Sequence, residues 1–106
     1  MSFIREHFVK PLTRSKGWRT VRKEHLIKHP YCEACGRTKK LEVHHIRDFS
    51  NYPALELDYS NLITLCDGST HCHFVFGHLG NWKSINLEIQ KDSDWFHDKI
   101  VTRRGR

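Results

Sequence analysis

The sequence lacks any apolar run near the roughly 20 residues that a membrane-spanning helix needs. Its first residues, 1–8, also lack the apolar stretch of a signal peptide. We therefore expect no membrane partner and a cytosolic location. Internal repeats and linker-like segments are absent as well, and a length of 106 residues suits one domain with a modest core.

Acidic residues are scarce in the first half of the chain. Residues 1–47 contain 12 Lys and Arg against 4 Asp and Glu, a balance of +8. Residues 48–106 contain 6 against 8, a balance of −2. Ordinary solvation of a surface and a polyanionic partner, most simply nucleic acid, explain this asymmetry equally well.

The chain has only four cysteines, and they form two pairs, Cys32/Cys35 and Cys66/Cys72. Cytosolic thiols stay reduced, so paired spacings there favour a metal over disulfides. Four thiolates suit structural zinc, which also compensates for a small core. The sequence therefore predicts a structural zinc site, with His71 as an alternative to Cys72. A redox-active Cys-x-x-Cys is less favoured, because no strand–helix pattern of that fold surrounds it.

Local patterns predict short elements around the cysteines. Ser15 can cap a helix that runs to about Lys28 and ends before Pro30. Residues 41–46 alternate between apolar and polar side chains, which predicts a short strand that pairs back on the cysteine turn. The apolar residues 61–66 predict a second short strand or a turn.

The second half of the chain predicts two further helices. One should begin near His71 and close at Gly77 and Gly80. A last short helix should begin at Asp92 or Ser93 and run through residue 100. Four apolar side chains before that helix could pack on the core: Trp82, Ile85, Leu87 and Ile89.

Histidines form the second group of ligand-type residues. His44 and His45 are adjacent within a predicted strand, and Asn61, His73 and His78 follow downstream. Because neighbouring residues on a strand point to opposite faces, the doublet can serve two tasks. One imidazole can bind a metal while the other meets a water molecule.

The order of these motifs resembles the HNH endonucleases, a family with a ββα-metal core. Five segments carry the resemblance: 18–22, 30–36, 41–46, 61–66 and 72–73. The chain looks most like the small freestanding members with a zinc knuckle, which phages or prophages often encode. Some of those proteins nick one DNA strand.

The resemblance implies an α+β fold with a small ββα-metal (His-Me finger) core and a zinc knuckle made of the four cysteines. An N-terminal basic helix and a short C-terminal extension complete it. We expect a single HNH nuclease domain over residues 1–106. Within it, residues 1–14 form a basic arm, residues 15–80 the knuckle and core, and residues 81–106 the extension.

The resemblance also implies roles for individual residues. His44 and His73 would bind the catalytic ion, and His45 would be the general base that deprotonates the attacking water. Asn61 would hold the His45 imidazole in orientation, through a hydrogen bond to a nearby backbone group. A neutral imidazole titrates near neutral pH, which suits a general base.

His78 departs from the family pattern. Relatives with a third histidine ligand carry it four residues after the second, and Gly77 stands at that position here. Five residues turn an α-helix by roughly 500°, so His78 would point about 140° away from His73. Metal binding by His78 therefore stays open. It requires a helix that bends or ends near Gly77; otherwise His78 contacts phosphate or packs under the tail.

The implied function is a metal-dependent DNA endonuclease with structural Zn²⁺ and a catalytic divalent ion. Mg²⁺ or Mn²⁺ is the expected ion, with Zn²⁺ or Ni²⁺ as alternatives. A monomer offers one site and should nick double-stranded DNA, whereas a double-strand break requires a dimer or two visits. Basic helix residues would bind phosphates: Arg19, Arg22 and Lys23.

Two other functions compete with the nuclease. A noncatalytic zinc-knuckle module that binds nucleic acid shares the cysteines and the charge. It does not explain the histidines together with Asn61. A redox-active thiol protein explains neither the histidines nor the charge.

Overall fold

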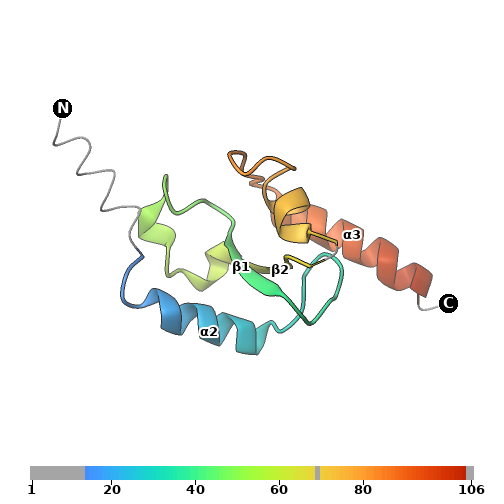
Figure 1. Ribbon diagram of the computed structural model, residues 1–106, viewed down its shortest axis with the longest axis horizontal. Helices are drawn as coiled ribbons and strands as arrows, with labels where there is room; N and C mark the ends of the chain where they lie inside the picture. The colour runs from blue at the N-terminus through green and yellow to red at the C-terminus, as the bar shows by residue number, and fades with distance from the viewer. Residues whose placement is uncertain (1–13, 69, 105–106) are drawn as a thin grey trace.

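The computed structural model describes residues 14–68 and 70–104. Of the basic arm expected at residues 1–14, all but Arg14 lies outside these residues. The described part is an α+β arrangement of two longer helices and a two-stranded sheet (Figure 1), which confirms the predicted class. The helices and strands are α2 (Trp18–Lys28), β1 (Leu41–His45), β2 (Leu62–Cys66) and α3 (Ile89–Arg104). Single helical turns lie between them: η1 (Pro53–Leu55), η2 (Tyr59–Asn61) and η3 (His73–Gly77).

The two strands form an antiparallel pair in which Leu41 lies opposite Cys66 and His45 opposite Leu62. The expectation that the first strand pairs with the cysteine turn is wrong. The cysteine turn instead joins the other strand, through the bond from the Glu33 amide to the Thr64 carbonyl at 2.9 Å. All five residues of β2 are buried, which explains their apolar run.

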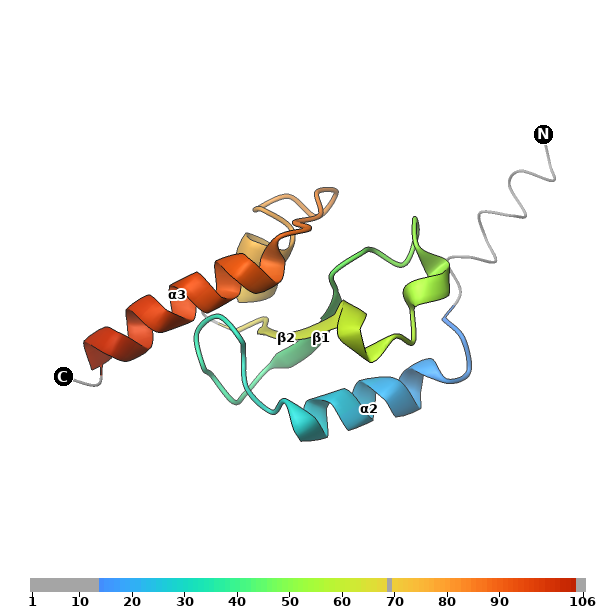
Figure 2. The ribbon, with the colours of Figure 1, turned by 180° about the vertical axis from the view of Figure 1, so that it is seen from behind.

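Helical segments cover both sides of the strand pair. Figure 1 and the reverse view in Figure 2 place α2 on one side and η3 with α3 on the other. Helix α2 buries His25 and leaves Arg19 and Lys23 exposed. Ser15 does not cap α2 as expected. The cap position belongs to Gly17, and the Ser15 amide donates to the Glu56 carboxylate at 3.1 Å.

The core is thin and rich in sulfur. Its eight buried residues include all four cysteines, and one further residue, Ile89, comes from α3. These residues are Cys32, Ala34, Cys35, Ile63, Leu65, Cys66, Cys72 and Ile89. Apolar burial alone therefore provides little of the stability of this domain.

Helix α3 begins earlier than the sequence predicts, at Ile89, because this side chain is fully buried in the core. The Asn86 side chain stabilises the first turn of α3: it accepts a hydrogen bond from the Glu88 amide at 3.0 Å and donates one to the Asp92 carboxylate at 2.8 Å. The expectation that Trp82 and Leu87 pack on the core is wrong. They are 57% and 51% exposed, since they lie in the loop before α3.

The helix expected from His71 is also different in the structure. His71 has a φ of 49°, in the left-handed region, so it does not belong to a right-handed helix. The turn η3 begins at His73 and has π-helical form. Across the described residues, no helix combines the length and apolarity needed to cross a membrane.

Candidate metal centre and active site

Three histidines converge beside the C-terminal half of β1. His44 lies on β1, His73 opens η3, and His78 follows η3 directly. Nδ1 of His44 lies 3.1 Å from Nε2 of His73, which lies 3.2 Å from Nε2 of His78. Three imidazole nitrogens this close together are a donor set typical of transition-metal sites in proteins.

The π-helical form of η3 explains why His78 reaches this point. A π-helix closes its turn over five residues, so side chains five apart lie on one side. The ring centroids of His73 and His78 are accordingly 4.9 Å apart. The condition that the sequence sets for His78, a helix that bends or ends near Gly77, is met, because η3 ends at Gly77.

Gly77 makes room for His44, the cluster histidine that lies on the strand. A Cβ built on Gly77 would lie 3.1 Å from Cε1 and 3.3 Å from both ring nitrogens of His44. This is tighter than ordinary van der Waals contact, and His44 is only 4% exposed. A residue with a side chain at position 77 would therefore push the ring out of place.

The hydrogen bonding and protonation of these rings fit a metal ion. Burial, and the nearby imidazoles, lower the pKa of His44 to about 3 and also lower the pKa of His73. Both rings are therefore neutral at pH 7, the form that binds metals. Nε2 of His44 is buried without a hydrogen-bond partner among the described residues. Nδ1 of His78 lies 2.9 Å from the Ser84 carbonyl, which orients that ring as outer partners do for metal-binding histidines.

His45 faces the other side of β1 and is only 6% exposed. Its Nε2 lies 2.9 Å from the backbone carbonyl of Glu56. A carbonyl only accepts, so Nε2 carries the proton and Nδ1 keeps its lone pair. Its ring packs on Trp18 at a centroid distance of 4.6 Å. Burial lowers the pKa of His45, so the ring is neutral at pH 7.

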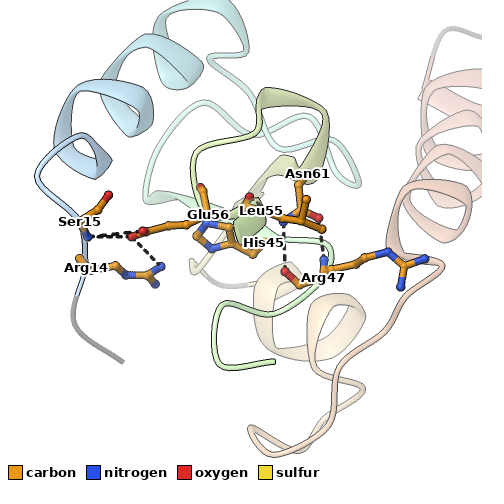
Figure 3. A network of polar contacts seen from close by, with 7 residues as sticks. All are labelled: Arg14, Ser15, His45, Arg47, Leu55, Glu56 and Asn61. Carbon is orange, nitrogen blue, oxygen red and sulfur yellow. Dashed lines mark hydrogen bonds and ion pairs between the residues drawn. The ribbon is translucent and has the colours of Figure 1, made fainter. Parts of the chain in front are cut away.

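Asn61 fixes the loop that carries this carbonyl (Figure 3). Its side-chain oxygen accepts from the Arg47 amide at 2.8 Å, and its Nδ2 donates to the carbonyls of Arg47 at 3.1 Å and Leu55 at 3.2 Å. Asn61 thus ties both ends of the segment between β1 and η2. It acts on His45 through the backbone, because Leu55 directly precedes Glu56.

Glu56 is a site residue that the motif pattern does not reveal. Its carboxylate is buried and contacts the Arg14 guanidinium at 3.9 Å, while its carbonyl holds His45 (Figure 3). The contact with His45 uses a backbone atom, so no side-chain motif signals it. Arg14 also stacks over the rings of Trp18 and Phe49, each at 4.8 Å.

The four cysteines form a separate, buried cluster. All are free thiols, and one sulfur from each lies within 4.8 Å of the others. The thiol of Cys72 donates to Cys32, which lowers the pKa of Cys32 to about 4 and raises that of Cys72. Thr70 contacts the sulfurs of Cys35 and Cys66 at 3.4 and 3.1 Å. Cys72, and not the alternative His71, completes this donor set, which fits tetrahedral zinc.

An open cavity of about 670 Å³ connects the histidines. Its lining includes both members of the doublet, His73 and His78, together with basic, acidic and aromatic side chains. The others are Arg14, Val43, Asp48, Phe49, Ser50, Asn51, Trp82, Lys83 and Ile85. A phosphodiester entering it would meet the histidine cluster and His45 together.

The basic residues of α2 do not line this cavity. Arg19 helps to line a second hollow, which shares Arg14 with the first. Arg22 is paired with Glu42 at 3.7 Å, and Lys23 is exposed. Of the three residues predicted to bind phosphates, two are therefore free to do so without breaking an ion pair among the described residues.

A two-stranded sheet followed by a short helical turn, with histidines on both and a cysteine cluster beside it, defines a ββα-metal protein. The family model described as HNH endonuclease matches residues 32–74. This match covers less than half of the chain and agrees with the resemblance that the motifs carry. The match includes His44, His45, Asn61 and His73, whereas His78 lies beyond it. No curated protein and no solved structure matches the chain significantly.

Proposed function

We propose that the protein is a metal-dependent endonuclease that nicks one strand of double-stranded DNA. The observation that carries this proposal is the meeting of a three-imidazole cluster and a neutral, backbone-held histidine in one cavity. The HNH family match supports nuclease chemistry in general. A noncatalytic zinc-knuckle module would have no use for such a cluster.

His44, His73 and His78 would hold the catalytic divalent ion. Mg²⁺ or Mn²⁺ is the expected ion, and an all-imidazole set also suits Zn²⁺ or Ni²⁺. Bound there, the ion would act as a Lewis acid on the scissile phosphate and stabilise the leaving oxygen. The cluster of four cysteines would hold a structural Zn²⁺ and replace part of the missing apolar core.

His45 would act as the general base. With the proton on Nε2 held by the Glu56 carbonyl, Nδ1 is free to take a proton from water. Asn61 would act as a positioning residue, because it holds the loop that carries this carbonyl. The water would attack phosphorus as it loses its proton to His45, and the 3′ oxygen would leave and take up a proton from solvent, so that the products are a 5′-phosphate and a 3′-hydroxyl.

Basic side chains would bind the DNA backbone on either side of the cut. Arg19, Arg22 and Lys23 present charge on α2, and Arg14 stands between α2 and the cavity. Phosphate contacts of this kind position the duplex without reading its sequence. Because one chain carries one such site, a monomer would leave the second strand intact.

The proposal extends to the whole chain. We infer one domain over residues 1–106, since Ile89 of the extension is part of the core. Residues 1–14 would be a basic arm, 15–80 the knuckle and core, and 81–106 the extension. The likeness to small phage members supports a phage or prophage protein that acts in the cytosol.

The proposal is tested by incubating supercoiled plasmid with the protein and Mg²⁺, Mn²⁺ or EDTA. We expect conversion to open circles with a divalent ion, no linear product at early times, and no conversion in EDTA. Ligation of the nicks by DNA ligase would verify the 5′-phosphate and 3′-hydroxyl ends. DNA binding without any metal-dependent conversion would instead favour the noncatalytic module.

A further inference from the structure

Trp82 is exposed in the wall of the histidine cavity. Its side chain is 57% exposed, yet its ring lies 5.5 Å from the His73 ring and 4.9 Å from the His78 ring, between centroids. Its ring also packs on Phe74 at 4.8 Å. Trp82 thus contacts two rings of the cluster and leaves a large apolar surface open toward the cavity, with Lys83 beside it.

The loop that carries Trp82 is fixed at both sides. The Ser84 carbonyl holds His78 at 2.9 Å, and the Asn86 amide donates to the Gly77 carbonyl at 3.0 Å. Trp82 lies between the residues that these two bonds join, and the bonds attach its loop to the end of η3. The loop therefore holds the indole in a fixed position before DNA arrives, which lowers the entropy cost of a contact between the indole and DNA.

The other exposed tryptophan of the described residues has different surroundings. Trp95 is 62% exposed on α3 and stacks with Lys99 at 5.4 Å, without a histidine neighbour in the described chain. Of these two tryptophans, only Trp82 combines an exposed side chain with contact to the histidine cluster. A phosphate at that cluster brings its own nucleotides to the cavity wall, because successive phosphates on one strand are about 3.4 Å apart along the axis.

We propose that Trp82 contacts DNA at the cut, stacking on a base next to the scissile phosphate after this base has left its duplex stack. The inference rests on the proposed function and adds a preference for duplexes that are locally easy to unstack. Aromatic side chains stack on any base, and wedges of apolar side chains kink duplexes in this way. Lys83 would bind a phosphate beside the same nucleotide.

The first test compares Trp82→Ala with Trp82→Phe and with the control Trp95→Phe. We expect Trp82→Ala to weaken duplex binding and kcat/KM by about 10- to 100-fold, as loss of a base–aromatic contact does. Trp82→Phe should retain most of both, and Trp95→Phe should match the wild type. Mn²⁺ affinity, measured by calorimetry, should change by less than about threefold in all three variants. Unchanged DNA binding by Trp82→Ala would overturn the inference. A loss of Mn²⁺ affinity large enough to explain the lower kcat/KM of Trp82→Ala would overturn it as well.

The second test examines unstacking directly. After the nick is mapped on an end-labelled duplex, a single mismatch is placed beside it. Because a mismatched base unstacks more easily, wild-type binding should tighten by about tenfold, and Trp82→Ala should gain much less. An equal gain in both proteins would overturn the inference.

The two proposals fail separately. Tryptophan fluorescence reports DNA binding without cleavage, and quenching that is lost in Trp82→Phe but kept in Trp95→Phe supports the contact even in an inactive protein. Metal-dependent nicking with no Trp82-dependent quenching would leave the nuclease in place and overturn the stacking contact.

Discussion

At the scale of single residues, His44 and His45 are neighbours on the chain but face different partners. His44 meets the other cluster histidines, and His45 meets Trp18 and the Glu56 carbonyl. The alternation of a strand predicts this division. It does not predict the Glu56 contact, which depends on how a loop folds rather than on a side-chain motif.

Gly77 provides a test of the histidine cluster. We expect Gly77→Ala to lower the affinity for the catalytic ion by about tenfold or more, because its Cβ would lie 3.1 Å from the His44 ring. The affinity is measured by titration with Mn²⁺ or Co²⁺. Gly68→Ala is the control, since its nearest contact would be Lys40 at an ordinary 3.8 Å. Equal affinities in the two variants would contradict the steric role of Gly77.

His25 predicts a pH dependence of stability. Burial, with a smaller contribution from the neighbouring His29, lowers the pKa of His25 from its ordinary 6.5 to about 4. The unfolded chain therefore binds the proton more readily, and the free energy of unfolding falls as the pH drops from about 6.5 to about 4. The loss due to His25 should be on the order of 2 kcal/mol.

Urea unfolding of the wild type and of His25→Gln at several pH values measures this effect. Acid also weakens zinc binding, but it does so in both proteins. The wild type should lose more stability than the variant over this range. Parallel curves would show that His25 does not carry the dependence.

At the scale of elements, the existence of the knuckle and the two strands is predictable, because the cysteine spacing and the apolar pattern lie in the local sequence. The pairing of β1 with β2 is not, because it joins segments that are distant along the chain. Turn η3 is not predictable either. Whether it is α or π depends on tertiary contacts such as the bond from the Asn86 amide to the Gly77 carbonyl. The start of α3 is set in the same way, by burial of Ile89 in a core from other segments.

The cysteine cluster should control folding as a unit. We expect Cys35→Ser to lose zinc and to unfold, since the binding energy of a structural zinc is folding energy. Zinc content by atomic absorption and helicity by circular dichroism measure this. Thr70→Val is the control, because it keeps all four thiols and removes only hydroxyl contacts to sulfur. A Cys35→Ser protein that stays folded without zinc would contradict the role of the cluster.

At the scale of the whole molecule, charge and site lie together. The half of the chain with a balance of +8 includes α2, β1 and the histidine doublet. Helix α2 lies on the other side of the strand pair from α3 (Figure 1). A duplex that follows the basic helix would therefore approach the cavity from the α2 side.

Salt dependence tests this approach. Replacing Arg19, Arg22 and Lys23 by glutamine should reduce the slope of log affinity against log salt by about 2 to 3, roughly one per phosphate contact. Fluorescence anisotropy of a labelled duplex in increasing KCl gives the slope. Replacing Lys91 and Lys99 on α3 is the control and should leave it nearly unchanged. An equal effect of both sets would mean that charge acts without a defined face.

We propose that His45 activates water beside an ion held by His44, His73 and His78. The most direct test of this proposal is plasmid nicking by the wild type and by His45→Ala, with zinc and Mn²⁺ contents measured in both. We predict that His45→Ala holds both metals but nicks at least about 100-fold more slowly, the share that a general base contributes. Nicking at the wild-type rate by a metal-loaded His45→Ala would contradict the account.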